Sequence, residues 1–146
     1  MKKALVVVLI SMFLSGNVWA WSPTYKGIPW GVDITKVGME MSLISKDAPY
    51  EGMTMWLPAA QDKRDGRVPI DRMALITDGV YLIGVRYLTN VRVDPLLDHF
   101  INKYGYPETD KLEEISTLYW VFPETIITLE EEQDFFRVTY WDRTAF

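Results

Sequence analysis

The chain contains no cysteine and only one histidine, His99, among its 146 residues. Zinc and similar metals are held by several histidine or cysteine side chains, so a single chain of this composition offers no such site. The absence of cysteine also excludes disulfides, which small secreted domains commonly contain. The hydrophobic core must therefore stabilise the fold without covalent cross-links.

The sequence also lacks the short motifs that mark common enzymes. No Gly-x-Ser-x-Gly elbow, phosphate-binding glycine loop or dinucleotide fingerprint occurs. His99 lies in a segment with helical periodicity, between Leu97 and Phe100, and we expect it at the flank of that helix rather than in a catalytic triad. We therefore assign no catalytic residue, no metal ligand and no cofactor, and an enzymatic role is disfavoured.

No apolar run in the sequence is long enough to span a membrane, which takes about 20 residues. The longest run covers residues 4–14, follows Lys2 and Lys3, and ends at Ser15–Asn17. This pattern, with the small Ala20 at its end, predicts a secretory signal peptide over residues 1–20 that is cleaved after Ala20. Since no cysteine follows for lipidation, we expect a periplasmic or secreted protein without stable membrane insertion.

Positive charge is scarce. The chain has 15 basic and 20 acidic residues and a formal net charge of −5, and loss of Lys2 and Lys3 with the leader would lower it by two more. Nucleic acids and anionic lipid headgroups favour basic surfaces. The charge therefore disfavours nucleic acid and membrane surfaces as partners.

Turn residues and hydrophobic periodicity divide residues 21–146 into alternating helical and extended segments. We expect a short helix capped by Asp33 that runs through Ile34, Val37 and Met41, although Gly38 weakens it. A second helix starts at Asp94-Pro95 and ends before Gly105. The expected strands are residues 53–57, a hairpin of 72–76 and 80–88 joined through Thr77-Asp78-Gly79, and a meander of 117–122, 125–130 and 135–141.

This order of elements predicts one α+β domain over residues 21–146. Hairpins dominate, so an antiparallel sheet (the hairpin plus the C-terminal meander), packed by one or two helices, is favoured over a parallel doubly wound sheet. The helix at residues 94–104 is predicted to bury Leu97, Phe100, Ile101 and Tyr104, which recur at helical spacing.

Two segments carry a resemblance. Gly27-Ile28-Pro29-Trp30-Gly31, followed by residues 33–37, resembles the opening of small exported bacterial domains of uncharacterised function, in which a Gly-x-x-Trp-Gly turn precedes a short helix. Residues 103–107, 118–120 and 126–129 are similar to the helix-to-strand passage of the same group. A more distant likeness is to the small lipoprotein subunits of outer-membrane assembly machinery, from which this chain departs by lacking the lipidation cysteine. The resemblance implies an α+β domain of the bacterial envelope and no catalytic residue.

Aromatic residues are abundant, with 6 tryptophans and 8 tyrosines. We expect Trp30 and Trp120 in the core, whereas aromatic residues in strands with one open face, together with arginines as polar anchors, suit a binding patch. The predicted patch consists of Tyr81, Tyr87, Tyr119, Tyr140, Trp141, Arg86 and Arg137.

The sequence thus favours a non-enzymatic periplasmic or secreted protein that binds a protein partner, or a glycan, through an aromatic-bearing sheet face. One alternative is a small envelope hydrolase that uses carboxylates such as Asp94, Asp98, Glu108 or Glu124. Another is an inhibitor or immunity-type protein that neutralises a basic partner electrostatically.

Overall fold

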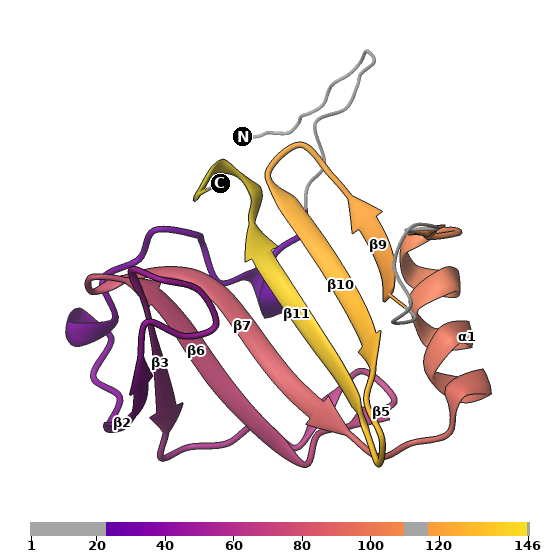
Figure 1. The fold of residues 1–146 in the computed structure, drawn as a ribbon, viewed down its shortest axis with the longest axis horizontal. Coiled ribbons are helices and arrows are strands. Elements are labelled where there is room, and N and C mark those ends of the chain that lie inside the picture. Colours follow the sequence, from indigo (N-terminus) through magenta and orange to yellow (C-terminus); the bar gives the residue numbers. More distant parts are fainter. Residues whose placement is uncertain (1–22, 110–116, 146) are drawn as a thin grey trace, which may run out of the picture.

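The computed structural model describes residues 23–109 and 117–145, so the expected leader, residues 1–20, lies outside the described residues. Within them the chain forms a sheet of eight antiparallel strands in the spatial order β2-β3-β6-β7-β11-β10-β9-β8 (Figure 1). A small two-stranded sheet, β4-β5, and one α-helix, α1, accompany it. The described part of the chain is therefore α+β in the broad sense, with the sheet dominant.

The strands of the large sheet are β2 (Met41–Lys46), β3 (Met53–Pro58), β6 (Arg72–Asp78), β7 (Tyr81–Thr89), β8 (Glu108–Thr109), β9 (Thr117–Val121), β10 (Thr125–Glu131) and β11 (Phe136–Asp142). The small sheet pairs β4 (Arg64–Asp65) with β5 (Val68–Pro69), and α1 spans Val93–Tyr104. The 3-10 helices are η1 (Tyr25–Gly27), η2 (Ile34–Lys36) and η3 (Arg143–Ala145).

The predicted hairpin and the predicted meander are both confirmed. β6 pairs with β7 through a turn in which Gly79 has φ +61°, a left-handed conformation that suits glycine. β9, β10 and β11 pair in succession, and β11 also pairs with β7, which joins the meander to the hairpin. The central strands of the sheet are thus the ones with the clearest sequence signals.

The first predicted helix is wrong. Asp33 does cap a helical turn, because its side chain accepts a hydrogen bond from the Thr35 N–H, but the turn is the 3-10 helix η2 and ends at Lys36. Gly38 has φ +72°, so the chain leaves the helical conformation there. Met41, expected on the helix, instead begins the edge strand β2.

The second predicted helix is confirmed as α1, although its buried face differs from the expectation. Leu96 and Phe100 are the residues that α1 buries, whereas Leu97 and Tyr104 are partly buried at the border of the core. Gly105 ends the helix, and its N–H donates to the Ile101 carbonyl.

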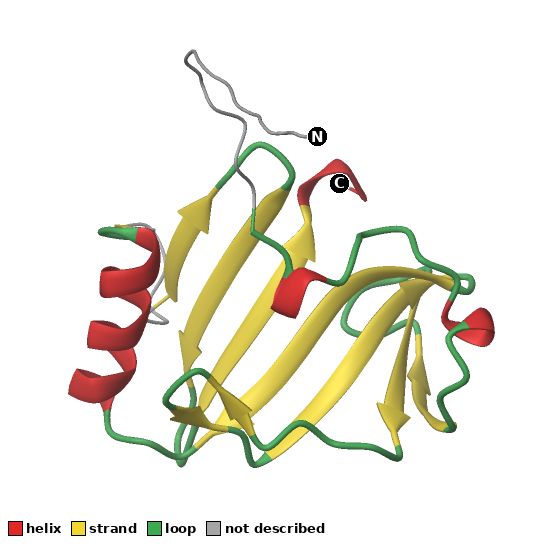
Figure 2. Cartoon of the chain, turned by 180° about the vertical axis from the view of Figure 1, so that it is seen from behind, coloured by secondary structure: helices red, strands yellow, loops and turns green. Residues whose placement is uncertain are grey.

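Successive strand residues point to opposite sides, which gives the large sheet two distinct faces. The covered face, marked by Tyr87 and Tyr140, packs against η1, the β4-β5 sheet and α1, which lie over it in Figure 2. The second face is marked by Arg86, Thr139 and Trp141, which alternate with the residues of the covered face along β7 and β11.

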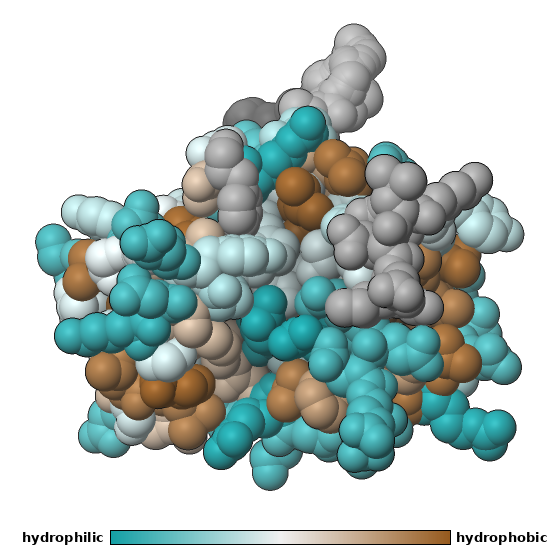
Figure 3. All heavy atoms as spheres, in the orientation of Figure 1, coloured by the Kyte–Doolittle hydropathy of each residue, from teal (hydrophilic) through white to brown (hydrophobic). Residues whose placement is uncertain are grey.

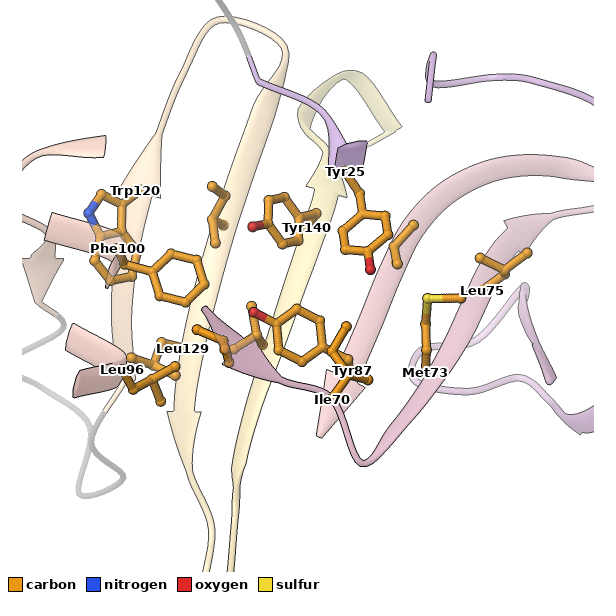
Figure 4. Packing of buried hydrophobic residues seen from close by; sticks show 14 of the residues in the cluster. Tyr25, Ile70, Met73, Leu75, Tyr87, Leu96, Phe100, Trp120, Leu129 and Tyr140 are labelled. Atoms are coloured by element: carbon orange, nitrogen blue, oxygen red, sulfur yellow. The ribbon is translucent and has the colours of Figure 1, made fainter. Parts of the chain in front are cut away.

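The main core lies on the covered face. Figure 4 shows side chains from η1, the sheet and α1 meeting there, with the ring centroids of Phe100 and Trp120 5.3 Å apart and those of Tyr25 and Tyr140 also 5.3 Å apart. Burial of each such side chain contributes about 1.5–3 kcal/mol. Trp120 is buried as expected, and Trp30 is partly buried against the same cluster.

Candidate functional site

Strand alternation divides the predicted binding residues between the two faces. Tyr87 and Tyr140 have 0% and 1% of their surface exposed and belong to the core, so they are unavailable to a surface patch. This corrects the expectation of one shared patch, because Arg86 and Tyr87, like Tyr140 and Trp141, are consecutive in a strand and point to opposite faces. Tyr81 is 55% exposed and begins β7, next to the hairpin turn.

The second face brings four of the predicted residues together. Cross-strand pairing aligns Arg86, Thr139, Thr128 and Tyr119 in one row across β7, β11, β10 and β9. Trp141 lies two residues beyond Thr139 on β11, and Arg137 lies two residues before it, so both share this face. The predicted arginine anchors and two of the aromatic residues are therefore neighbours.

Arg86 occupies the centre of this face and is held in place by two contacts. Its Nε donates to the Thr139 hydroxyl at 2.9 Å, and its guanidinium carbon lies 5.8 Å from the centroid of the Trp141 ring. Partial burial lowers the pKa of Arg86, the nearby charge of Arg137 lowers it further, and the charges of Glu130 and Glu132 partly oppose this. An arginine side chain nevertheless stays protonated in proteins.

The two arginines differ in how their charge is balanced. Arg137 forms ion pairs with Glu130, at 3.1 Å, and with Glu132, at 2.6 Å. Among the described residues, no carboxylate lies within ion-pair distance of Arg86. Arg86 is therefore a positioned, half-buried cation whose hydrogen-bonding capacity exceeds its one bond through Nε.

An apolar band continues from Arg86 toward the β2 edge of the sheet. Buried Ile76, Ile83 and Trp141 form a second small cluster, against which Met53 and Met55 pack while remaining partly exposed. In the loop between β2 and β3, Tyr50 is 57% exposed, and its ring centroid lies 6.0 Å from that of Trp141. Figure 3 shows hydrophobic side chains gathered at the lower left, where Figure 1 places β2 and β3.

The edge strand β2 carries exposed apolar side chains among polar ones, and its Leu43 pairs with Trp56 of the covered face. Leu43 and Ile44 in β2 are 49% and 47% exposed. We call the surface formed by Tyr50, Met53, Met55 and Arg86 the Met-Arg surface. Sequence analysis does not single out its first three residues: Met53 and Met55 lie in the strand predicted over residues 53–57, but no local pattern places that strand or Tyr50 near Arg86.

A second polar centre lies inside the core, around the carboxylate of Asp65. Asp65 is 3% exposed, and its Oδ2 accepts hydrogen bonds from the hydroxyls of Tyr87 and Tyr140, each at 2.7 Å. The Tyr25 hydroxyl donates to Asp62 at 2.8 Å. The β4-β5 sheet and the loop before it thus place two carboxylates against three buried tyrosines.

Burial dominates the ionisation of these tyrosines. It raises the pKa of Tyr87 and of Tyr140 well above the ordinary value, and the negative charge of Asp65 raises both further. Burial, followed by the hydrogen bond to Asp62, also raises the pKa of Tyr25 strongly. All three are therefore neutral hydrogen-bond donors at physiological pH, which is a structural role rather than that of a nucleophile or base.

Cavities on the covered side of the described part of the chain include two with distinct linings. The first, of about 560 Å³, lies between the β4-β5 turn and α1, and His99 and Lys103 line it. The second, of about 390 Å³, is mostly apolar and lies between the segment around η1 and η2 and the strands β6 and β7, with Tyr25 and Asp62 at its wall.

The carboxylates considered for a hydrolase are dispersed over different elements. Asp94 and Asp98 belong to α1, Glu108 to β8, and Glu124 to the turn between β9 and β10. All four are exposed, and only Asp98 lines one of the two cavities described above. These cavities therefore bring no pair of these acids together.

Within residues 23–109 and 117–145, no cluster of three or more His, Cys, Asp or Glu side chains is arranged to hold a metal ion. In the same residues, no helix has the length and apolar character needed to cross a membrane. Comparison with protein-family models, curated proteins and solved structures found no match. Functional inference therefore rests on the geometry of the chain itself.

Proposed function

We propose that this chain is an exported, non-enzymatic binding protein that engages a protein partner through the Met-Arg surface. The observation that carries the proposal is Arg86, a guanidinium fixed by Thr139 and Trp141 without a carboxylate partner among the described residues. A partly desolvated cation gains most from an anionic group that excludes water from it. The partner is therefore expected to place an Asp or Glu side chain on Arg86.

The composition of the surrounding surface supports a protein rather than a glycan as the partner. Arginine, methionine and aromatic residues are enriched in protein interfaces, and exposed apolar patches mark such interfaces. Tyr50, Met53 and Met55 supply this character next to Arg86.

Export is the second part of the proposal and rests on the pattern of residues 1–20. Mass spectrometry of the protein from its native cells should find an amino terminus at Trp21. An intact Met1 end on the bulk of the protein, together with its recovery from the cytosol, would contradict export.

The binding proposal is tested by site-specific photocrosslinking in the native cells. A photoreactive amino acid at Met55 should give a discrete crosslinked protein, whereas the same group at the exposed Asn90, beyond the end of β7, should not. Arg86→Gln should weaken binding of the identified partner by roughly tenfold or more, as expected for an arginine at an interface hot spot.

The matched control is Arg92→Gln, which removes an equal charge from an exposed residue at the start of α1. Its affinity for the partner should equal that of the unmodified protein. If both substitutions weaken binding equally, the loss of affinity reflects only the change in net charge. If Arg86→Gln does not weaken binding, the partner does not bind at the Met-Arg surface. If the protein binds purified glycans and no protein, the proposed protein partner is wrong and the ligand is a glycan.

A further inference from the structure

The cavity between the β4-β5 turn and α1 is large enough for a ligand. Its volume of about 560 Å³ lies within the range of small-molecule sites, and it exceeds many times the share of one water molecule, about 30 Å³. Val91 and Pro95 provide an accessible apolar part of the lining, and Arg67, His99 and Lys103 provide polar groups. An apolar wall with a few convergent polar groups is the usual anatomy of a small-molecule site.

The lining carries an excess of positive charge in a chain that is acidic overall. Arg67 and Lys103 line the cavity, and neither forms an ion pair with a carboxylate of the described residues. The Lys103 amine lies 5.3 Å from the Tyr104 ring centroid. Asp98 is the one acidic residue of the lining, so two cations face one carboxylate.

His99 adds an unsatisfied polar atom at the same place. Its Nε2 is buried, and no described group forms a hydrogen bond with it. Buried polar atoms in folded proteins nearly always have a partner, and a missing one calls for an explanation. A ligand group that reaches this nitrogen would supply the missing bond.

The β4-β5 turn holds His99 in position. Gly66 has φ +60°, and a Cβ built there would lie 2.5 Å from the His99 Cε1, so the turn fits closely against the imidazole edge. Burial lowers the pKa of His99, Lys103 and Arg67 lower it further, and Asp65 opposes them. An anion bound beside the ring would favour the imidazolium, so binding should raise the His99 pKa.

We propose that this cavity binds a small organic anion, with a carboxylate or phosphate group between Arg67 and Lys103 and an apolar body against Val91 and Pro95. The anion also provides an acceptor for His99 as the imidazole becomes protonated. This site lies on the covered side of the sheet and is independent of the Met-Arg surface, so either proposal can fail alone.

The test uses the fact that His99 is the only histidine of the chain. In tag-free protein, the proton on Cε1 of His99 gives a single imidazole signal in one-dimensional NMR spectra. Inorganic phosphate, acetate and hexanoate are titrated separately at millimolar concentrations. With at least one anion, we expect a saturable shift of the signal and a higher His99 pKa. A preference for phosphate or for the carboxylates identifies the anionic group that the cavity binds.

The double variant Arg67→Gln, Lys103→Gln should weaken that binding by roughly tenfold or more, since it removes both charge-assisted hydrogen-bond donors to the anion. Both side chains are exposed, so the fold should persist, which circular dichroism checks. The control Lys36→Gln, Arg92→Gln removes the same charge away from the cavity lining and should bind normally. An unshifted His99 signal with all three anions, or equal binding by the two double variants, would overturn the proposal.

Discussion

Asp65 shows how a single residue can organise the polar interior of an otherwise hydrophobic core. Its Oδ2 accepts both the Tyr87 and the Tyr140 hydroxyls, and all three residues are buried. Asp65→Ala would leave two buried hydroxyls without this acceptor, and each unsatisfied group costs about 1–3 kcal/mol. We expect the free energy of unfolding to fall by roughly 2–5 kcal/mol, as measured by urea denaturation.

The tyrosine variants provide the internal control for this prediction. Tyr87→Phe removes one donor while Tyr140 still bonds to Asp65, so its cost should be the smaller one, about 1 kcal/mol. A double-mutant cycle between Asp65 and Tyr87 should give a clear coupling energy. Additive effects of the two substitutions would show that the hydrogen bond contributes no stability of its own.

Gly66 and Gly79 form a matched pair for a second prediction at the residue scale. Both have φ close to +60°, but a Cβ at Gly66 meets His99 at 2.5 Å, whereas a Cβ at Gly79 meets nothing within 4 Å. Gly79→Ala should therefore cost only the strain of the left-handed backbone, about 1–2 kcal/mol, and Gly66→Ala should cost more.

Adding His99→Ala to Gly66→Ala removes the clashing ring but leaves the backbone strain. The double variant should then regain the stability that Gly66→Ala loses beyond the loss in Gly79→Ala. Thermal unfolding of the unmodified protein and these three variants measures the difference. If Gly66→Ala is no more destabilising than Gly79→Ala, the close fit of the turn against His99 is contradicted.

At the scale of elements, the close packing of β7 against its two neighbours requires a glycine at residue 84, Gly84. Gly84 lies between Ile76 of β6 and Trp141 of β11, and an added Cβ would stand 3.1 Å from the Trp141 ring and 3.3 Å from the Ile76 Cβ. The Ile76 Cβ is fixed by its backbone, so the Trp141 ring must move. Gly84→Ala should destabilise the protein by about 1–3 kcal/mol.

A displaced Trp141 ring would also alter its contact with Arg86, which lies 5.8 Å from the ring centroid. We therefore expect Gly84→Ala to change the near-ultraviolet circular dichroism of the tryptophans while the far-ultraviolet spectrum is kept. Unchanged stability and unchanged spectra would mean that the sheet opens enough to accept the methyl group. The second face would then be more adaptable than its packing indicates.

The elements predicted correctly are those whose signals are local. Asp78-Gly79 between β-rich runs, and Asp94-Pro95 with Gly105 around an amphipathic segment, identify the hairpin and α1 without knowledge of the remaining chain. β2 has no prediction beyond Met41, the end of the expected helix, because its sequence MSLISK lacks the regular apolar alternation of a strand. Its strand conformation is stabilised by pairing with β3, a contact that no local pattern reveals.

The candidate site also has parts that local sequence patterns predict and parts that depend on tertiary packing. Alternation along β11 places Arg137 and Trp141 on one face, whereas the pairing of β7 with β11, which brings Arg86 beside them, has no local signal in the sequence. Which face is open depends on where α1 and the β4-β5 sheet dock, so Tyr87 and Tyr140 were assigned to the surface although they are core residues. The cavity at His99 joins a turn to a helix through tertiary packing alone and leaves no sequence signature.

On the scale of the whole molecule, the three buried tyrosines make stability sensitive to alkaline pH. Burial raises the pKa of Tyr25, Tyr87 and Tyr140 above the value of about 10 that tyrosine has in unfolded chains. Above this pH the unfolded state loses protons that the folded state retains. The stabilising contribution is therefore fully present below about pH 10 and is lost as the pH rises, by about 1.4 kcal/mol per tyrosine and pH unit.

Such a loss exceeds the stability of a typical domain within a few pH units, so we expect cooperative unfolding at alkaline pH. Far-ultraviolet circular dichroism and tyrosinate absorbance at about 295 nm should change together in this transition, because the buried hydroxyls ionise only as the fold opens. Tyr87→Phe should remove one ionisation from the transition and make it less steep. Tyr106→Phe, at an 87% exposed residue, is the control and should leave the steepness unchanged. Ionisation of all tyrosines while the dichroism stays native would contradict the coupling between this cluster and the fold.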